Sequence, residues 1–82
     1  MDGLTETVTR NLKAELARRD KTPHDLASAW GYEIRAVDNR LRGRIPLSTD
    51  EIEKTAQLFG LEPEMLVMLL LQPIDNIKQI KP

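Results

Sequence analysis

The chain has 82 residues, enough for one small domain, and its formal net charge of −1 is not that of a generally basic nucleic-acid binder. Hydrophobic residues make up 40% of it, but it holds one Trp, one Tyr and one Phe, so we expect a core of Leu, Ile, Val, Met and Ala. It contains no cysteine, which excludes disulfide bonds and thiolate metal sites.

Two segments bear on targeting. The first ten residues, MDGLTETVTR, contain no apolar run, so we expect no secretory signal there. The longest apolar run, Met65 to Leu71, is much shorter than the roughly 20 residues that span a bilayer. We therefore expect a cytoplasmic protein that does not bind membranes.

The charge is distributed unevenly along the chain. Residues 1–45 hold nine Lys or Arg and seven Asp or Glu, whereas residues 46–82 hold three and six. The excess of positive charge is therefore local, as expected if one face of the protein contacts phosphate groups.

The first predicted helix extends from about Thr5 to Arg19. Apolar side chains recur at every fourth residue, at Leu4, Val8, Leu12 and Leu16. This spacing places them in one stripe that faces the core. The polar stretch from Arg18 to Lys21 ends the helix.

The second predicted helix begins after Thr22, which is a favourable N-cap residue. Pro23 suits the first helical position, and Asp25 lies where the acid of a capping box belongs. Gly31 ends the helix, because glycine adopts the left-handed conformation without a Cβ penalty. The inward-facing residues are Leu26, Ala27 and Trp30.

The third predicted helix extends from about Glu33 to Arg42, and Gly43 ends it. Val37 and Leu41, four residues apart, form its buried side. The opposite side carries Arg35, Asp38, Asn39 and Arg42. A capped helix, a glycine turn and a second helix rich in arginine form the layout of a helix-turn-helix, whose second helix enters the DNA major groove.

Two further helices follow. Ser48 and Glu51 form a capping box that opens the fourth helix, and Gly60 ends it. A fifth helix begins at Glu62-Pro63 and continues through Gln72, where Pro73 stops it.

We therefore expect an all-α protein with one domain, residues 1–72, and a C-terminal tail, residues 73–82. No strand alternation appears before the tail. The tail carries Ile74, Ile77 and Ile80 at every third residue, which is compatible with an extended segment, a short helical turn or disorder.

The fifth predicted helix is apolar on all sides from Met65 to Leu71, and a terminal helix of so small a protein cannot bury every side internally. We therefore expect a homodimer interface here, which the isoleucines of the tail extend. The expected interface residues are Met65, Met68, Leu69, Leu70, Ile74 and Ile77.

Several residues at fixed spacing then suggest a family: Leu26-Ala27, Gly31, Val37, Gly43 and the ending Leu58 to Leu66. On these features, residues 12–68 resemble the Cro/cI-type (XRE) helix-turn-helix domain of phage repressors and bacterial regulators. The resemblance implies a compact five-helix, phage-repressor-like domain in the cytoplasm of a bacterial cell, of chromosomal or phage origin. It also implies a dimer that binds a palindromic operator in double-stranded DNA.

The resemblance also implies positions of contact. The base-contacting positions of the family fall on Ile34, Arg35 and Asn39, and its phosphate-contacting positions fall on Glu33, Arg42 and Arg44. The chain departs from the family in three places. Pro23 stands where a glutamine often supports recognition, Ile34 replaces a polar residue, and Arg40-Leu41 replaces an apolar residue followed by an acid.

The chemistry of these side chains suits base contacts. An arginine such as Arg35 can donate two hydrogen bonds to guanine O6 and N7, and an asparagine such as Asn39 can bracket adenine N6 and N7. Asp38 either accepts from cytosine N4 or holds Arg35 or Arg42 in position. Ile34 either contacts a thymine methyl group or packs within the domain.

The remaining arginines suit phosphate contacts, which position a protein on DNA without specifying sequence. We expect this role for Arg40, Arg42 and Arg44, and for Tyr32 through its hydroxyl group. A solvated helix face is the alternative interpretation of the same arginines.

The leading functional interpretation is a transcription regulator that binds an operator as a dimer. One alternative is the antitoxin of a toxin–antitoxin pair, with autoregulatory DNA binding. Another is a protein-interaction module that does not bind DNA. Because no acid–base pair, activated nucleophile or metal-ligand set is visible, we expect no enzyme activity, metal, cofactor or small-molecule ligand; the only histidine, His24, has no ligand-spaced neighbour except Asp25.

Overall fold

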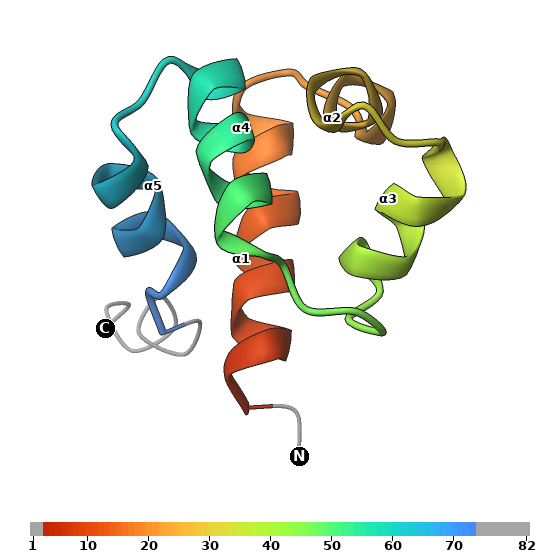
Figure 1. Ribbon diagram of the computed structural model, residues 1–82. Coiled ribbons are helices and arrows are strands. Elements are labelled where there is room, and N and C mark those ends of the chain that lie inside the picture. Colours follow the sequence, from red (N-terminus) through yellow and green to blue (C-terminus); the bar gives the residue numbers. More distant parts are fainter. Residues whose placement is uncertain (1–2, 74–82) are drawn as a thin grey trace.

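The computed structural model describes residues 3–73, and in this range all regular secondary structure is helical (Figure 1). The five helices are α1 (Gly3–Arg18), α2 (Pro23–Trp30), α3 (Ile34–Leu41), α4 (Thr49–Phe59) and α5 (Pro63–Leu70). The predicted all-α fold with five helices is therefore confirmed. The predictions for Ile74, Ile77 and the rest of the tail lie outside the described residues.

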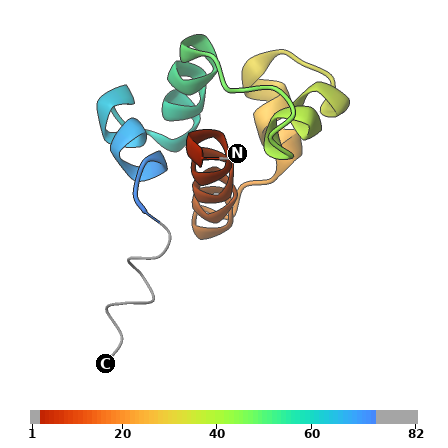
Figure 2. The same cartoon turned by 90° about the horizontal axis from the view of Figure 1, so that it is seen from below.

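The five helices form a ring of pairwise contacts. α1 packs against α3 and α5, α2 packs against α3 and α4, and α4 packs against α5. Figure 2 looks nearly along α1 and shows α5 on one side of it and α3 on the other, with α4 and α2 completing the arc. α3 therefore packs against both α2 and α1.

The core at the centre of the ring draws on every helix. Its buried hydrophobic residues are Leu12, Leu16, Leu26, Trp30, Val37, Leu41, Ala56, Leu66 and Leu70. Trp30 also donates a hydrogen bond from Nε1 to Thr55 Oγ1 at 2.9 Å, which satisfies its buried polar atom. The predicted stripe of α1 was wrong at its first member, because Leu4 is 67% exposed in the first turn of the helix.

The helix ends follow the local signals of the sequence. Both predicted capping boxes are present, at Thr22 with Asp25 and at Ser48 with Glu51. Gly31 ends α2 in the left-handed conformation at φ 75°. α3 is shorter than predicted at both ends, because Glu33 is its N-cap residue and Arg42 its C-cap residue.

α5 has a buried side as well as an exposed one, although its sequence is apolar throughout. Leu66 and Leu70 face the core, whereas Met65 is 49% and Met68 is 65% exposed. Leu70 is only 2% exposed, so its predicted place in a dimer interface was wrong: it packs inside its own domain. None of the helices described here is both long and apolar enough to cross a membrane.

Asn11 links the two ends of the described chain. Its Nδ2 atom donates hydrogen bonds to the carbonyl oxygens of Leu70 and Gln72, each at 2.8 Å. The last carbonyl groups of a helix have no partner within the helix. Asn11 of α1 therefore caps the end of α5. The two partners lie too far apart in the sequence for a local pattern to predict the contact.

Replacing Asn11 tests the importance of this cap. We expect Asn11→Ala to lower the free energy of unfolding by about 1 kcal/mol, because two carbonyl groups lose their donor. Asn11→Asp will lower it further, because its carboxylate would face the negative end of the α5 dipole. Urea unfolding followed by Trp30 fluorescence measures both. The exposed α4 residue Gln57 provides a control, since Gln57→Ala should change stability by less than about 0.5 kcal/mol; equal stability of wild type and Asn11→Asp would contradict the cap.

Candidate nucleic-acid interface

A three-residue turn fixes the angle between α2 and α3. Gly31 adopts φ 75°, and the next backbone N–H, that of Tyr32, donates to the carbonyl oxygen of Ala27 at 3.0 Å. The Tyr32 ring meets the Trp30 ring edge-on, with ring centroids 5.7 Å apart. Beneath them, Leu26 and Val37 are fully buried. α2 and α3 are therefore two consecutive helices joined by a short glycine-containing turn and packed on a shared core.

The outer side of α3 carries the predicted base-contacting residues. Ile34 is 39% exposed and Arg35 is exposed, whereas Asp38 and Asn39 are partly buried. Ile34 therefore lies at the surface and does not belong to the core. Packing within the domain was one of the two interpretations of this residue. Asp38 forms an ion pair with Arg42, in which Oδ2 of Asp38 and Nε of Arg42 are 2.7 Å apart. In the free protein, Asp38 therefore orients the Arg42 side chain.

Three adjoining surface hollows follow α3 from end to end. The first, of about 390 Å³, lies between the starts of α2 and α3. It shares Pro23 and Asp38 with the second, of about 520 Å³, which lies between α1 and α3. The second shares Lys13, Leu41 and Arg42 with the third, of about 550 Å³, which reaches the loop after α3. We call these three hollows together the basic groove.

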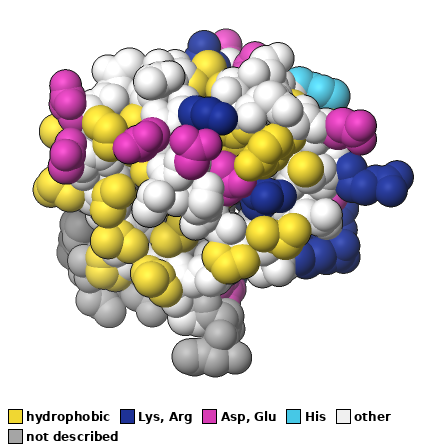
Figure 3. Space-filling view, viewed as in Figure 1, with side chains coloured by type: hydrophobic (Ala, Val, Ile, Leu, Met, Phe, Trp, Pro, Cys, Tyr) yellow, Lys and Arg dark blue, Asp and Glu magenta, His cyan; other side chains and the backbone are white. Residues whose placement is uncertain are grey.

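The groove concentrates positive charge. Its lining contains six of the twelve Lys and Arg residues of the chain: Arg10, Lys13, Lys21, Arg35, Arg42 and Arg44. It contains two of the thirteen acidic residues, Glu6 and Asp38. In Figure 3, dark blue side chains gather at the same side of the molecule as α3. This surface is therefore strongly positive, although the net charge of the whole chain is −1.

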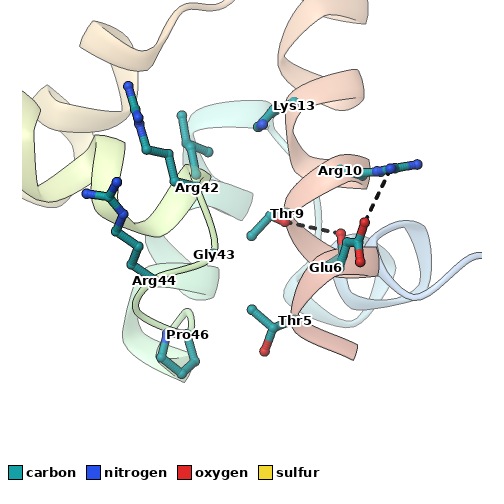
Figure 4. Close-up of a pocket in the computed structure, with 10 residues that line it drawn as sticks. Thr5, Glu6, Thr9, Arg10, Lys13, Arg42, Gly43, Arg44 and Pro46 are labelled. Atoms are coloured by element: carbon teal, nitrogen blue, oxygen red, sulfur yellow. Dashed lines mark hydrogen bonds and ion pairs between the residues drawn. The ribbon is translucent and has the colours of Figure 1, made fainter. Parts of the chain in front are cut away.

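The two walls of the third hollow present their cations differently (Figure 4). On the α1 wall, Lys13 points across the gap, whereas Arg10 turns away to an ion pair with Glu6 at 3.2 Å. On the other wall stand Arg42 and Arg44. Within residues 3–73 no ion pair holds Lys13 or Arg44, so both are available to an anionic ligand.

Two residues predicted to contact phosphate, Arg40 and Tyr32, are held by an acid inside the domain. Arg40 is 16% exposed and donates from Nε to Glu51 Oε2 at 2.8 Å and from Nη1 to the carbonyl oxygen of Ala36 at 2.9 Å. Its guanidinium carbon lies 4.9 Å from the centroid of the Tyr32 ring. The Tyr32 hydroxyl donates to the same Glu51 oxygen at 2.7 Å. These groups fix α3 to α4 instead of facing solvent.

Glu51 is the acceptor at the centre of this network, and it is only 3% exposed. Its other oxygen, Oε1, accepts from the backbone N–H of Ser48 at 3.0 Å. Burial alone would raise the pKa of Glu51, but the hydrogen bonds from Ser48, Tyr32 and Arg40 outweigh it and lower the pKa below its usual value. The hydrogen bond to Glu51 raises the pKa of Tyr32. Glu51 is therefore ionised at neutral pH.

Four further residues belong to the site. One of them, Glu33, was predicted from the sequence, and the other three were missed. Glu33 is exposed at the N-cap of α3 without a side-chain cap, and because its carboxylate repels phosphate, a contact at this point can only come from the backbone. The three missed residues are Arg10, Lys13 and Lys21, which lie in α1 or directly after it. Arg10 and Lys13 lie three residues apart on α1, and Lys21 follows the helix. Nothing local in the sequence shows that these residues adjoin α3.

Comparison of the chain with models of protein families, with curated proteins and with solved structures finds no match.

The Glu51 network makes the stability of the fold depend on pH, and the sign of this dependence follows from the pKa shift. The pKa of Glu51 is lower in the folded protein than in the unfolded chain. Its contribution to the free energy of unfolding is therefore fully present above the unfolded pKa of about 4.3, and it is lost as the pH falls through the folded pKa. Glu51→Gln should lower the free energy of unfolding near neutral pH by on the order of 2 kcal/mol, since hydrogen bonds to a charged group are lost. The difference from wild type should shrink as pH falls below about 4.

Urea unfolding at a series of pH values measures this dependence. Glu62→Gln is a matched control, because Glu62 is exposed at the N-cap of α5 and makes no side-chain cap hydrogen bond. A Glu51→Gln deficit that stays constant from neutral to acid pH would show that the charge of Glu51 does not stabilise the fold.

Proposed function

We propose that this protein is a sequence-specific transcription regulator that binds double-stranded DNA as a homodimer, with α3 in the major groove. The observation that carries the proposal is the basic groove, which collects half of the Lys and Arg residues along the exposed side of α3. A helix fits the major groove, which is about 12 Å wide, and cations beside it meet the phosphate backbone.

Base contacts are assigned to the outer side of α3. Arg35 is exposed and makes no ion pair within the described residues, so its two-pronged donor is available for guanine O6 and N7. Asn39, one helical turn further, is assigned to adenine. The exposed surface of Ile34 suits a thymine methyl group. Asp38 acts mainly through Arg42, which it orients.

Phosphate contacts are assigned to both walls of the third hollow. Arg42 and Arg44 follow α3, and Lys13 faces them from α1. Backbone N–H groups at Glu33 supply a further contact at the start of α3. Lys13 replaces Arg40 and Tyr32 in the set, because their polar atoms are bound to Glu51. Contacts from two helices fix the angle at which α3 enters the groove.

The homodimer is assigned to the exposed side of α5. Met65 and Met68 are exposed there, and Leu69 beside them is partly buried. Two-fold symmetry would place two copies of α3 on half-sites about 34 Å apart. Such a regulator acts in the cytoplasm of a bacterial cell, where operator DNA is accessible.

A second candidate function is favoured by the same exposed methionines. Methionine surfaces adapt to varied protein partners. In an antitoxin, this face would bind a toxin while α3 binds the operator for autoregulation. A protein-interaction module without DNA binding would use the same face. The two alternatives differ from the leading proposal in the partner of α5 and in the binding of DNA.

Selection of bound sequences from a random duplex pool tests DNA binding. We expect a palindromic site whose affinity falls steeply with salt. Arg35→Ala should weaken binding to that site by about 1–3 kcal/mol and relax one base preference, whereas Arg44→Ala should weaken specific and random DNA alike and reduce the salt slope by about one. Lys54→Ala is the control, because Lys54 pairs with Asp50 on α4 outside the groove. Salt-independent binding, or equal losses for Lys54→Ala, would contradict the proposal.

Sedimentation over a range of concentrations tests the homodimer. We expect the wild-type mass to rise from monomer to dimer, and Met68→Asp to remain monomeric, because a buried charge without a partner opposes association. Ile45→Asp is the matched control, since Ile45 is an exposed apolar residue in the loop before α4. A wild-type mass that stays monomeric at every concentration would contradict the dimer and direct attention to a different protein partner.

A further inference from the structure

One ion pair in the third hollow of the basic groove has no part in the DNA contacts proposed above. Glu6 and Arg10 both line this hollow, and both lie on α1. Oε2 of Glu6 and Nη2 of Arg10 are 3.2 Å apart. Figure 4 shows the guanidinium group of Arg10 turned toward Glu6 and away from the opposite wall of the hollow. The ion pair therefore removes one cation from the surface that would face phosphate.

The position of Arg10 on α1 does not by itself keep its side chain out of the hollow. Lys13 follows Arg10 by three residues, and residues three apart lie on the same side of a helix. Lys13 points across the gap. The residue four positions before Lys13 is Thr9, which carries no charge, whereas the residue four positions before Arg10 is Glu6. The acid, and not the helix geometry, therefore sets the direction of Arg10.

The Glu6–Arg10 pair is open to competition from another anion. The side chain of Glu6 is 46% exposed and that of Arg10 is 59% exposed. An exposed ion pair at this spacing stabilises a protein only slightly, because water competes for both groups. A phosphate group is a strong competitor, since its oxygens accept two parallel hydrogen bonds from one guanidinium group. Phosphate that is attracted by the neighbouring Lys13 and Arg44 can therefore displace Glu6 from Arg10.

We propose that the Glu6–Arg10 pair restrains DNA binding, an inference that rests on the proposed function. When a duplex binds, Arg10 leaves Glu6 and contacts a phosphate group at the third hollow. Breaking the ion pair opposes binding and lowers the affinity. The reduction is the same for every sequence, because a phosphate contact positions the protein without reading bases. Glu6 thus sets the strength of DNA binding, whereas the outer side of α3 sets its specificity.

Replacing Glu6 by glutamine tests this restraint. Glu6→Gln keeps the size of the side chain and removes its charge, so Arg10 is available before DNA arrives. We expect the variant to bind the selected site and random duplex each about two- to fivefold more tightly than wild type at low salt. The gain in affinity should shrink as the salt concentration rises, because salt screens exposed charges. Fluorescence anisotropy of labelled duplexes measures both affinities across a salt series.

Glu53→Gln is the matched control for the change in net charge. Glu53 is an exposed acid on α4 that does not line the basic groove. Its substitution changes the net charge of the chain by the same amount, so we expect little change in affinity for either duplex. An equal gain for Glu53→Gln and Glu6→Gln would show that only the total charge matters, and it would overturn the restraint by Glu6.

A second substitution separates release of Arg10 from direct repulsion between Glu6 and phosphate. Direct repulsion acts whether or not Arg10 is present, whereas the restraint requires Arg10. We therefore expect Glu6→Gln to increase the affinity less in an Arg10→Gln background than in wild type. A gain of undiminished size in that background would show that Glu6 only repels phosphate, and it would overturn the proposal.

The outcomes also distinguish failure of this inference from failure of the proposed function. If wild type and Glu6→Gln bind duplex DNA with the same affinity and the same steep salt dependence, the restraint is overturned and the proposed function stands. If neither protein shows salt-dependent binding to any duplex, both are overturned.

Discussion

The carboxylate of Glu51 is the constraint on which the orientation of α3 depends. It caps its own helix through Ser48, and its second oxygen accepts from both Tyr32 and Arg40. A buried carboxylate is costly unless donors surround it. Here the donors come from the start of α4, from the turn between α2 and α3, and from α3 itself. One buried charge therefore ties three elements together and sets the direction in which the outer side of α3 faces.

The same constraint separates arginines that look alike in the sequence. Arg35, Arg40, Arg42 and Arg44 stand within ten residues. Helical spacing correctly placed Arg35 and Arg42 on one side of α3, but it did not show that Arg40 meets an acid eleven residues further on. Its inward position becomes evident only when α4 is placed. A cluster of arginines thus contains both members with a buried acidic partner and members that face solvent.

Local signals predicted most of the fold, and long-range packing decided the rest. The capping boxes at Thr22 and Ser48 involve residues three positions apart, so the sequence contains the whole interaction. The Asn11 cap joins α1 to the end of α5, and no local pattern predicts it. An apolar helix such as α5 has no hydrophobic periodicity, so the sequence could not show that Leu70 is buried. In the candidate site, the α3 residues were predictable, whereas Lys13 required the position of α1.

The positive surface beside α3 arises from where the acids are placed rather than from the net charge. Glu15 is buried and pairs with Arg18 and Arg19, and Glu51 is buried with Arg40. These pairs neutralise arginines that stabilise the fold and leave the cations of the basic groove with few acidic neighbours. At physiological ionic strength, exposed charges farther apart than about 8 Å are largely screened. A phosphate group at α3 would therefore respond to the six cations and two acids of the groove, and not to the total of −1.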